Sequence, residues 1–216
     1  MIKAVIFDFD GLILDTETAW FDSYREVLHE DYQFDLKLNE FVKCVGSDDT
    51  VLFDYLKENM TATLDVDSIK ERVKNLHTAK ISKEKAREGV EQCLVDAKEA
   101  GLQIALATSS KREWAVTHLT NLNLFSYFDF LVTQDDVEHI KPAPDLFLKA
   151  IEVLGIQPEE GLVFEDSLNG LIAAKKAQLT TIVIPNPVTE ALPFENYHLK
   201  LSSMAEMRLS DILRTL

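Results

Sequence analysis

Apolar and polar residues follow two different rhythms along this chain. After the first strand, apolar residues recur every three or four positions, beginning with Trp20, Phe21, Tyr24, Val27 and Leu28. This spacing is typical of helices that bury one face. It predicts a helix behind residue 17 and three more over 38–45, 50–57 and about 65–85, with Ser47, Asp48 and Asp49 as N-cap candidates for the third. No strand is expected between residues 17 and 87, so this block should form a small helical bundle.

The rest of the chain alternates short apolar runs with amphipathic segments. Strands are predicted over residues 4–7, 103–107, 130–132, 161–164 and 180–184, and helices over 91–100, 113–122, 145–154, 168–177 and 204–213. Such alternation predicts a parallel sheet with helices on both faces. The expected fold class is therefore α/β, with a Rossmann-like, doubly wound core formed by residues 1–15 and 88–216 and a helical domain, residues 16–87, inserted behind the first strand.

Composition and net charge limit the kinds of molecule that this protein is expected to bind. The chain has 216 residues, 46% of them hydrophobic, and a net charge of −15, which disfavours nucleic acid and anionic membranes. A small anionic substrate stays compatible, because a local metal or lysine reverses the sign inside one cleft. Two cysteines, Cys44 and Cys93, make no disulfide framework, and no signal peptide or membrane-spanning run is visible. We expect a cytoplasmic monomer.

Two carboxylates follow the first strand. Ala4–Phe7 is a continuous apolar run, as in a strand buried on both faces, and Asp8 and Asp10 come directly after it. At a spacing of two they lean the same way, at the edge where open α/β sheets bind ligands. Neighbouring acids need a cation, a proton or different roles. One interpretation is a metal site with a nucleophilic Asp and an Asp that transfers protons; the alternative is a solvated acidic turn.

Two further strand ends carry polar residues that suit a phosphate. Thr108, Ser109 and Ser110 follow the second strand, and hydroxyl and backbone N–H groups at such a junction bind phosphate, although Ser110 is equally typical of an N-cap. Lys141 stands before a Pro-Ala-Pro segment. It is placed to neutralise a phosphate and a carboxylate, whereas most lysines are solvated surface residues.

The fourth strand end is acidic. Glu165 and Asp166 end the run that starts at Gly161, and oxygen ligands of this kind suit Mg²⁺. The alternative for this segment is N-capping of the next helix, with Ser167 as the cap.

These four motifs, in this order on successive strand ends, resemble the haloacid dehalogenase superfamily. The resemblance is to its β-phosphoglucomutase-like and phosphoglycolate-phosphatase-like branch, in which a helical cap of the C1 type follows the first motif. It covers nearly the whole chain, and its most specific part is the stretch from Asp8 to Glu17. The inserted helical domain would then be the cap, with hinges near Asp15–Thr16 and Arg87–Gly89.

The resemblance implies a role for each motif. Asp8 would be the nucleophile and a Mg²⁺ ligand, and Asp10 the general acid and base that offers its backbone carbonyl to the metal. Thr108, with Ser109, would bind the phosphoryl group, and Lys141 would orient Asp8. Asp166 would be a direct metal ligand, with Glu165 supporting it or binding through water.

Two departures from the mutase pattern favour a phosphatase of small, sugar-phosphate-like phosphomonoesters. Trp20 stands near the position of a histidine, and residues 45–49 are acidic where a phosphate-binding arginine is expected. Trp20, Ser47 and Lys70 are candidate substrate contacts, although a core position in the first cap helix is the commoner fate of an aromatic residue such as Trp20. The five histidines show no metal-ligand spacing and receive no role. A phosphosugar mutase, a 2-haloacid dehalogenase and a non-catalytic binding protein stay as alternatives.

Overall fold

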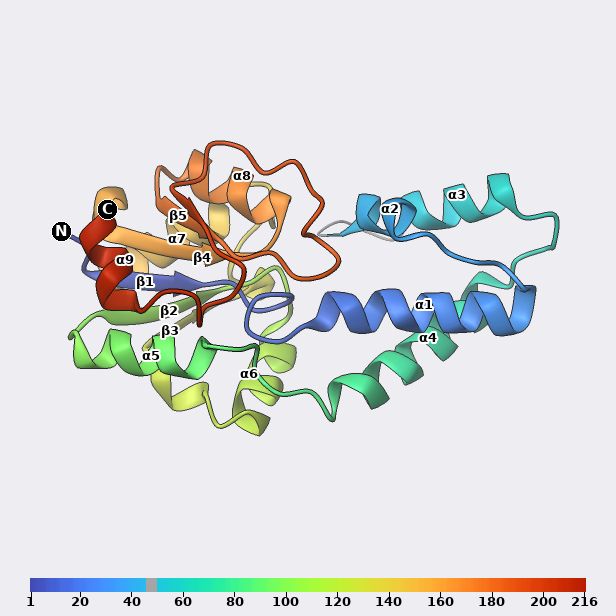
Figure 1. Cartoon of the computed structure of the whole chain (residues 1–216), viewed down its shortest axis with the longest axis horizontal. Helices are drawn as coiled ribbons and strands as arrows, with labels where there is room; N and C mark the ends of the chain where they lie inside the picture. Colours follow the sequence, from blue (N-terminus) through green and yellow to red (C-terminus); the bar gives the residue numbers. More distant parts are fainter. Residues whose placement is uncertain (46–49) are drawn as a thin grey trace.

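A parallel sheet carries the site at its edge. The computed structural model describes residues 1–45 and 50–216, in which six strands run in the order β3-β2-β1-β4-β5-β6 (Figure 1). The strands are β1 (Ala4–Phe7), β2 (Gln103–Ala107), β3 (Phe130–Val132), β4 (Gly161–Glu165), β5 (Thr180–Val183) and β6 (Leu199–Lys200). Every pairing is parallel, and Phe7 lies opposite both Leu106 and Phe164. Because β1 is central, Asp8 emerges in the middle of the carboxyl edge.

Helices cover both faces of this sheet, as the alternating pattern predicts. One face packs on α5 (Val90–Glu99), α6 (Arg112–Asn121) and α9 (Leu209–Thr215), and the other on α7 (Asp145–Leu154) and α8 (Leu168–Lys176). All four residues of β1 are fully buried, and they alternate between the two clusters. Burial on both sides explains why the strand is apolar throughout. The doubly wound, Rossmann-like fold class is confirmed.

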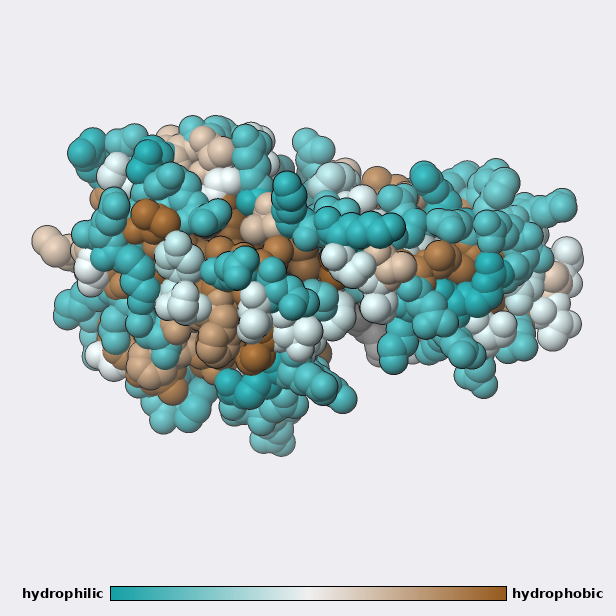
Figure 2. All heavy atoms as spheres, turned by 90° about the horizontal axis from the view of Figure 1, so that it is seen from below, coloured by the Kyte–Doolittle hydropathy of each residue, from teal (hydrophilic) through white to brown (hydrophobic). Residues whose placement is uncertain are grey.

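Within the described residues, four helices form a separate lobe, which we call the cap (Figures 1 and 2). They are α1 (Thr16–Tyr32), α2 (Leu38–Phe41), α3 (Thr50–Asn59) and α4 (Val66–Ile81). They enclose an apolar cluster of their own, centred on side chains such as Val27, Leu56 and Val73. Val188, from the loop behind β5, also belongs to this cluster. The cap is therefore a small folded unit that also touches the core.

Both connections between cap and core lie at the strand tips. Asp15 caps α1 by accepting a hydrogen bond from the Thr18 amide at 3.0 Å. On the return, Arg87 donates from its backbone to the Ile13 carbonyl at 2.8 Å. Its guanidinium donates to the carbonyls of Gly11, Ile184 and Pro185 at 2.5, 3.1 and 2.7 Å. Arg87 thus ties the cap exit to the loop that follows Asp8.

Some boundaries differ from those that the pattern predicts. The fourth cap helix ends at Ile81 instead of continuing to 85, and the last helix begins at Leu209 instead of 204. Residues 38–45 divide into α2 and a 3₁₀ turn, because the i→i+3 hydrogen bond from Val45 to Val42 tightens the end. The 3₁₀ segments are η1 (Val42–Cys44), η2 (Phe125–Tyr127), η3 (Gln134–Asp136) and η4 (Pro158–Glu160). Among the described residues, no helix combines the length and apolarity that crossing a membrane requires.

Candidate active site

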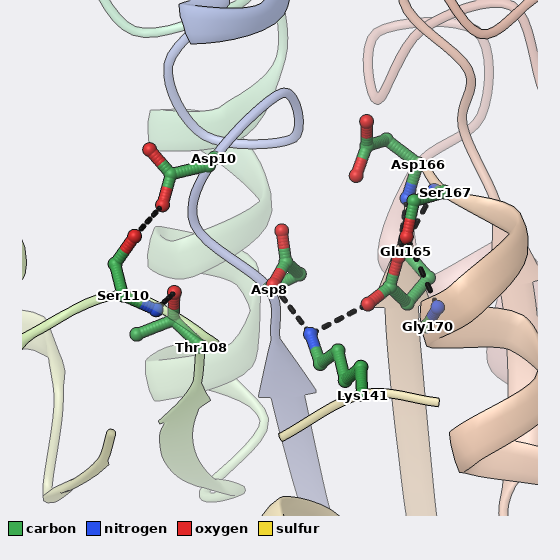
Figure 3. Close-up of polar contacts among 9 residues, drawn as sticks. All are labelled: Asp8, Asp10, Thr108, Ser110, Lys141, Glu165, Asp166, Ser167 and Gly170. Carbon is green, nitrogen blue, oxygen red and sulfur yellow. Dashed lines mark hydrogen bonds and ion pairs between the residues drawn. The ribbon is translucent and has the colours of Figure 1, made fainter. Parts of the chain in front are cut away.

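Lys141 joins two strand tips into one buried charge network. Its Nζ lies 2.5 Å from Asp8 Oδ1 and 2.6 Å from Glu165 Oε1 (Figure 3). Only 5% of the Lys141 side chain is exposed. A buried ammonium needs a carboxylate partner, and Lys141 has two, so its charge is compensated and one negative charge of the set is left over. Lys141 is therefore directed into the strand tips and is not a solvated surface lysine.

Glu165 is fixed by donors on both of its oxygens. Beyond Lys141 on Oε1, its Oε2 accepts from the Asp166 amide at 2.9 Å and from the Ser167 amide and hydroxyl at 3.0 Å each. Ser167 also caps α8, accepting from the Gly170 amide at 3.0 Å. A Cβ at Gly170 would lie 1.8 Å from Glu165 Oε1, so only glycine leaves room for this carboxylate. Glu165 thus serves to hold Lys141 and the start of α8.

Only one of the two carboxylate oxygens of Asp166 has a hydrogen-bond partner. Its Oδ2 accepts from Asn186 Nδ2 at 2.7 Å, while its Oδ1 is buried and has no hydrogen-bond partner. Carboxylate oxygens of Asp8, Glu165 and Asp166 lie within 4.8 Å of one another. Gly11, at φ +81°, approaches so closely that a Cβ there would lie 2.2 Å from Asp166 Oδ2. A buried, unpartnered carboxylate oxygen beside two other acids fits a hard divalent cation such as Mg²⁺.

The electrostatics of the acids support the same conclusion. Burial raises the pKa of Asp8 to about 7, with Lys141 opposing the rise and the charge of Glu165 adding to it. Burial, together with the charges of Glu165 and Asp8, raises the pKa of Asp166 well above its usual range. Burial alone would lower the pKa of Lys141, but the two facing carboxylates outweigh it and the pKa is raised. The site carries more negative charge than Lys141 can offset, and a cation would relieve it.

Asp10 is held by two donors from the core. Its carboxylate points toward Ser110 and accepts from Ser110 Oγ at 2.6 Å (Figure 3). The other oxygen accepts from Trp114 Nε1 at 2.9 Å. The Ser110 amide in turn donates to Thr108 Oγ1 at 3.1 Å. The expectation that Ser110 caps the following helix is wrong, because Lys111 occupies the N-cap position and Ser110 turns to Asp10 instead.

A cavity of about 350 Å³ opens above these residues. Trp20 and Val45 reach it from the cap, and Trp114 and Ile140 from the core. Glu17, at the start of α1, adds a carboxyl whose pKa is raised to about 8 by burial and by the charges of Asp10 and Asp8. The base of the cavity is therefore acidic, and its walls are largely apolar.

Most of the residues predicted from sequence line this one cavity. They are Asp8, Asp10, Trp20, Thr108, Ser109, Lys141 and Asp166, while Glu165 supports them from behind. Both interpretations of Trp20 agree with the structure, because its side chain lines the cavity and also packs against the apolar cluster of the cap. Lys70 does not line the cavity within the described part of the chain, and its Nζ lies 5.0 Å above the ring of Phe53 in the cap. Ser47 lies outside the described residues.

Several residues of the site escape sequence reasoning. Gly170 could have been recognised, since glycine is unfavourable within a predicted helix and its presence there indicates a packing or functional constraint. Asn186 follows β5 as the acids follow β1 and β4, so its place at a strand tip was a second signal. Trp114 and the role of Ser110 left none, because their contacts with Asp10 join positions more than 90 residues apart.

Comparisons with known proteins agree with this geometry. The family described as haloacid dehalogenase-like hydrolase matches residues 5–184. A Bacillus subtilis protein named "Putative phosphatase YhcW" is 44% identical over 99% of this chain and 97% of its own. A Thermotoga maritima protein named "Phosphorylated carbohydrates phosphatase" is 34% identical over 84% of each chain. A crystal structure of a hydrolase of the same family from Deinococcus radiodurans R1, with bound phosphate and sodium, superposes with a TM-score of 0.84 at 25% identity, covering 99% of this chain and 96% of that one.

Proposed function

Because the chain belongs to the haloacid dehalogenase-like hydrolase family, we propose that it is a Mg²⁺-dependent phosphatase of small phosphomonoesters that acts through a phosphorylated Asp8. The observation that carries the proposal is the buried bridge from Lys141 to Asp8 and Glu165, beside the orphan oxygen of Asp166. Such a set holds Lys141 in the site and would bind a divalent cation, and these two positive groups would offset the negative charge that develops in phosphoryl transfer.

In the first step, a carboxylate oxygen of Asp8 attacks phosphorus. A bond from that oxygen to phosphorus forms, the bond from phosphorus to the leaving oxygen breaks, and Asp10 gives its proton to the leaving alcohol. Lys141 offsets the charge on Asp8 and on the transferring group. Thr108, buried between β2 and the Ser110 turn, binds the phosphoryl oxygens with the backbone at Ser109.

In the second step, water attacks phosphorus of the phosphorylated Asp8. Asp10, now ionised, takes the proton from this water, and the bond between phosphorus and the Asp8 oxygen breaks to release inorganic phosphate. Asp8 and Asp166 would hold Mg²⁺, with Glu165 supporting them, and the bound ion would supply charge stabilisation around the phosphoryl oxygens. The backbone carbonyl of Asp10 is a further expected ligand.

The cavity walls bear on the choice between phosphatase and mutase. Lys141 is the sole described cation among the lining residues, so a second phosphate group would find no further positively charged side chain there. Trp20, Trp114 and Ile140 instead suit the carbon skeleton of an uncharged leaving group, and Glu17 adds a group that hydrogen-bonds hydroxyls. Phosphorylated carbohydrates combine these features, in agreement with the name of the Thermotoga maritima relative.

A panel assay tests the proposal. Purified protein with Mg²⁺ is given sugar phosphates, nucleotides, phosphoglycolate, and β-glucose 1-phosphate with a bisphosphate activator, and released phosphate is measured. We expect phosphate release from sugar phosphates, abolished by EDTA and by Asp8→Asn. Isomerisation of the β-glucose phosphate without phosphate release would favour the mutase, and chloride release from a 2-chloroacid without Mg²⁺ would favour the dehalogenase.

A further inference from the structure

Both tryptophans of the chain lie at the junction of cap and core, and one of them binds Asp10. Trp20 comes from α1 and Trp114 from α6, and both line the active-site cavity. The indole Nε1 of Trp114 donates to Asp10 Oδ1 at 2.9 Å. Ser110 Oγ holds the other oxygen at 2.6 Å, so the two donors together fix the plane of the carboxylate.

Trp114 is itself supported from the cap. The ring of His77, on α4, stacks on Trp20 with centroids 3.7 Å apart and an interplanar angle of 10°. The His77 ring also lies near that of Trp114, with centroids 5.8 Å apart and an interplanar angle of 23°. His77 is 1% exposed, and burial lowers its pKa to about 4, so at neutral pH it is an uncharged aromatic ring. Trp20, His77 and Trp114 thus form one aromatic stack, which we call the junction stack, from α1 through α4 to α6.

We propose that Trp114 is a positioning residue for Asp10, and that the cap holds Trp114 in place through the junction stack. The inference rests on the proposed phosphatase function. A hydroxyl such as that of Ser110 rotates freely about its bond, whereas an indole N–H points in the direction that the packed ring gives it. Trp114 therefore sets the orientation of Asp10. The Trp114 ring is in turn packed by His118 of its own helix, at 4.0 Å between centroids, and by His77 of the cap at 5.8 Å.

This arrangement links proton transfer to the position of the cap. A shift of α4 relative to α6 removes His77 from the Trp114 ring, leaves that ring with His118 of its own helix, and loosens the carboxylate that protonates the leaving group. Small displacements of a catalytic group cost up to about a hundredfold in rate. The reaction then proceeds efficiently only when the cap is seated, which excludes bulk water from the site during transfer of the phosphoryl group to Asp8.

Trp114→Phe tests the positioning role, because it removes the N–H and keeps a ring for the stack. The substrates are phenyl phosphate and 4-nitrophenyl phosphate, which are similar in size but differ in how strongly the leaving group needs a proton. The value of kcat/KM reports the step in which that group departs. We expect the variant to lose about tenfold more kcat/KM on phenyl phosphate than on 4-nitrophenyl phosphate, whereas the smaller ring in the cavity wall should affect both substrates alike. Equal losses on both substrates would overturn the positioning role.

Two variants of the cap complete the test. His77→Ala should shift the same ratio in the same direction and His77→Phe, which restores a flat ring, should bring it back; thermal unfolding checks that each variant folds. Tyr55→Phe is the control, since Tyr55 lies on α3 of the cap, pairs with Phe34 and belongs neither to the junction stack nor to the residues that line the cavity, and the ratio should stay within about twofold of the wild type. If His77→Ala lowers both substrates equally, the cap does not act through Trp114. If the wild type hydrolyses neither aryl phosphate, it is the proposed function that fails.

Discussion

Replacement of Gly170 by alanine distinguishes the geometry of this site from ordinary helix energetics. Gly170 is the third residue of α8, where glycine is less favourable than alanine by up to about 1 kcal/mol. On propensity alone, Gly170→Ala would therefore stabilise the protein. In the structure, however, the new Cβ would lie 1.8 Å from Glu165 Oε1 and 1.9 Å from its Cδ, so the carboxylate has to move.

Displacing Glu165 has a large cost. It withdraws a partner at 2.6 Å from buried Lys141 and breaks the three hydrogen bonds that Asp166 and Ser167 donate to Oε2. Breaking a buried charge pair costs about 3–5 kcal/mol. After the propensity gain is subtracted, we expect the free energy of unfolding to fall by about 3 kcal/mol, which for a chain of this length lowers Tm by roughly 6–12 °C.

Thermal and urea unfolding in EDTA measure this effect, and a double-mutant cycle locates its cause. In a Glu165→Ala background the obstructing carboxylate is gone, so Gly170→Ala should become neutral or stabilising, with a coupling energy of about 3–4 kcal/mol. The same single variant should lose most of its phosphatase activity, because Lys141 no longer has both partners. A Gly170→Ala protein with an unchanged or higher Tm would refute the assigned packing of Glu165 against α8.

Three further predictions concern the acids. Asp10→Ala should lower activity most on alkyl phosphates, whose leaving groups need protonation, by about 10²–10⁴-fold, and equal losses on alkyl and aryl phosphates would contradict the acid role. As pH increases toward 7, the affinity for Mg²⁺ measured by titration calorimetry should increase by up to about tenfold per pH unit, because the buried Asp8 has a pKa of about 7 and must lose its proton to bind metal. An affinity independent of pH would count against Asp8 as a ligand. The pKa of Glu17 is raised to about 8, so the folded state keeps a proton that the unfolded state releases above about pH 4.5, and stability falls as pH rises between these values. Glu17→Gln should therefore be more stable than the wild type by roughly 4–5 kcal/mol at pH 8.5 in EDTA and no more stable at pH 4, whereas a difference independent of pH would contradict the raised pKa.

The strand tips of this fold are predictable because a strand buried on both faces admits only apolar residues. Where β1, β2 and β4 end, polar side chains appear at once, and parallel pairing brings Asp8, Thr108 and Asp166 to the same edge. The sheet class and the inserted helices follow from the two apolar rhythms in the same way. These features depend on periodicity and topology, which a sequence carries locally.

Side-chain contacts that follow no periodic pattern cannot be predicted from the sequence in this way. The last predicted helix starts too early because Ser202 donates from its amide and hydroxyl to Glu206 at 2.6 Å each and closes a turn there. Arg208, bound to Asp96 at 2.6 and 2.8 Å, then fixes where α9 begins. The strand β6 is missed because two residues are too few to show a period. Trp114 belongs to the same class, since nothing near it in sequence points to Asp10.

The phosphorylated Asp8 is the centre of this account, and acid quenching detects it most directly. The protein is mixed with Mg²⁺ and 4-nitrophenyl phosphate, quenched in acid during turnover and digested, and the N-terminal peptides are analysed by mass spectrometry. We expect the added mass of one phosphoryl group on Asp8, which hydroxylamine removes and which Asp8→Asn lacks together with all hydrolysis. Turnover with no phosphorylated Asp8, or hydrolysis by Asp8→Asn at near the wild-type rate, would contradict the assignment of the nucleophile.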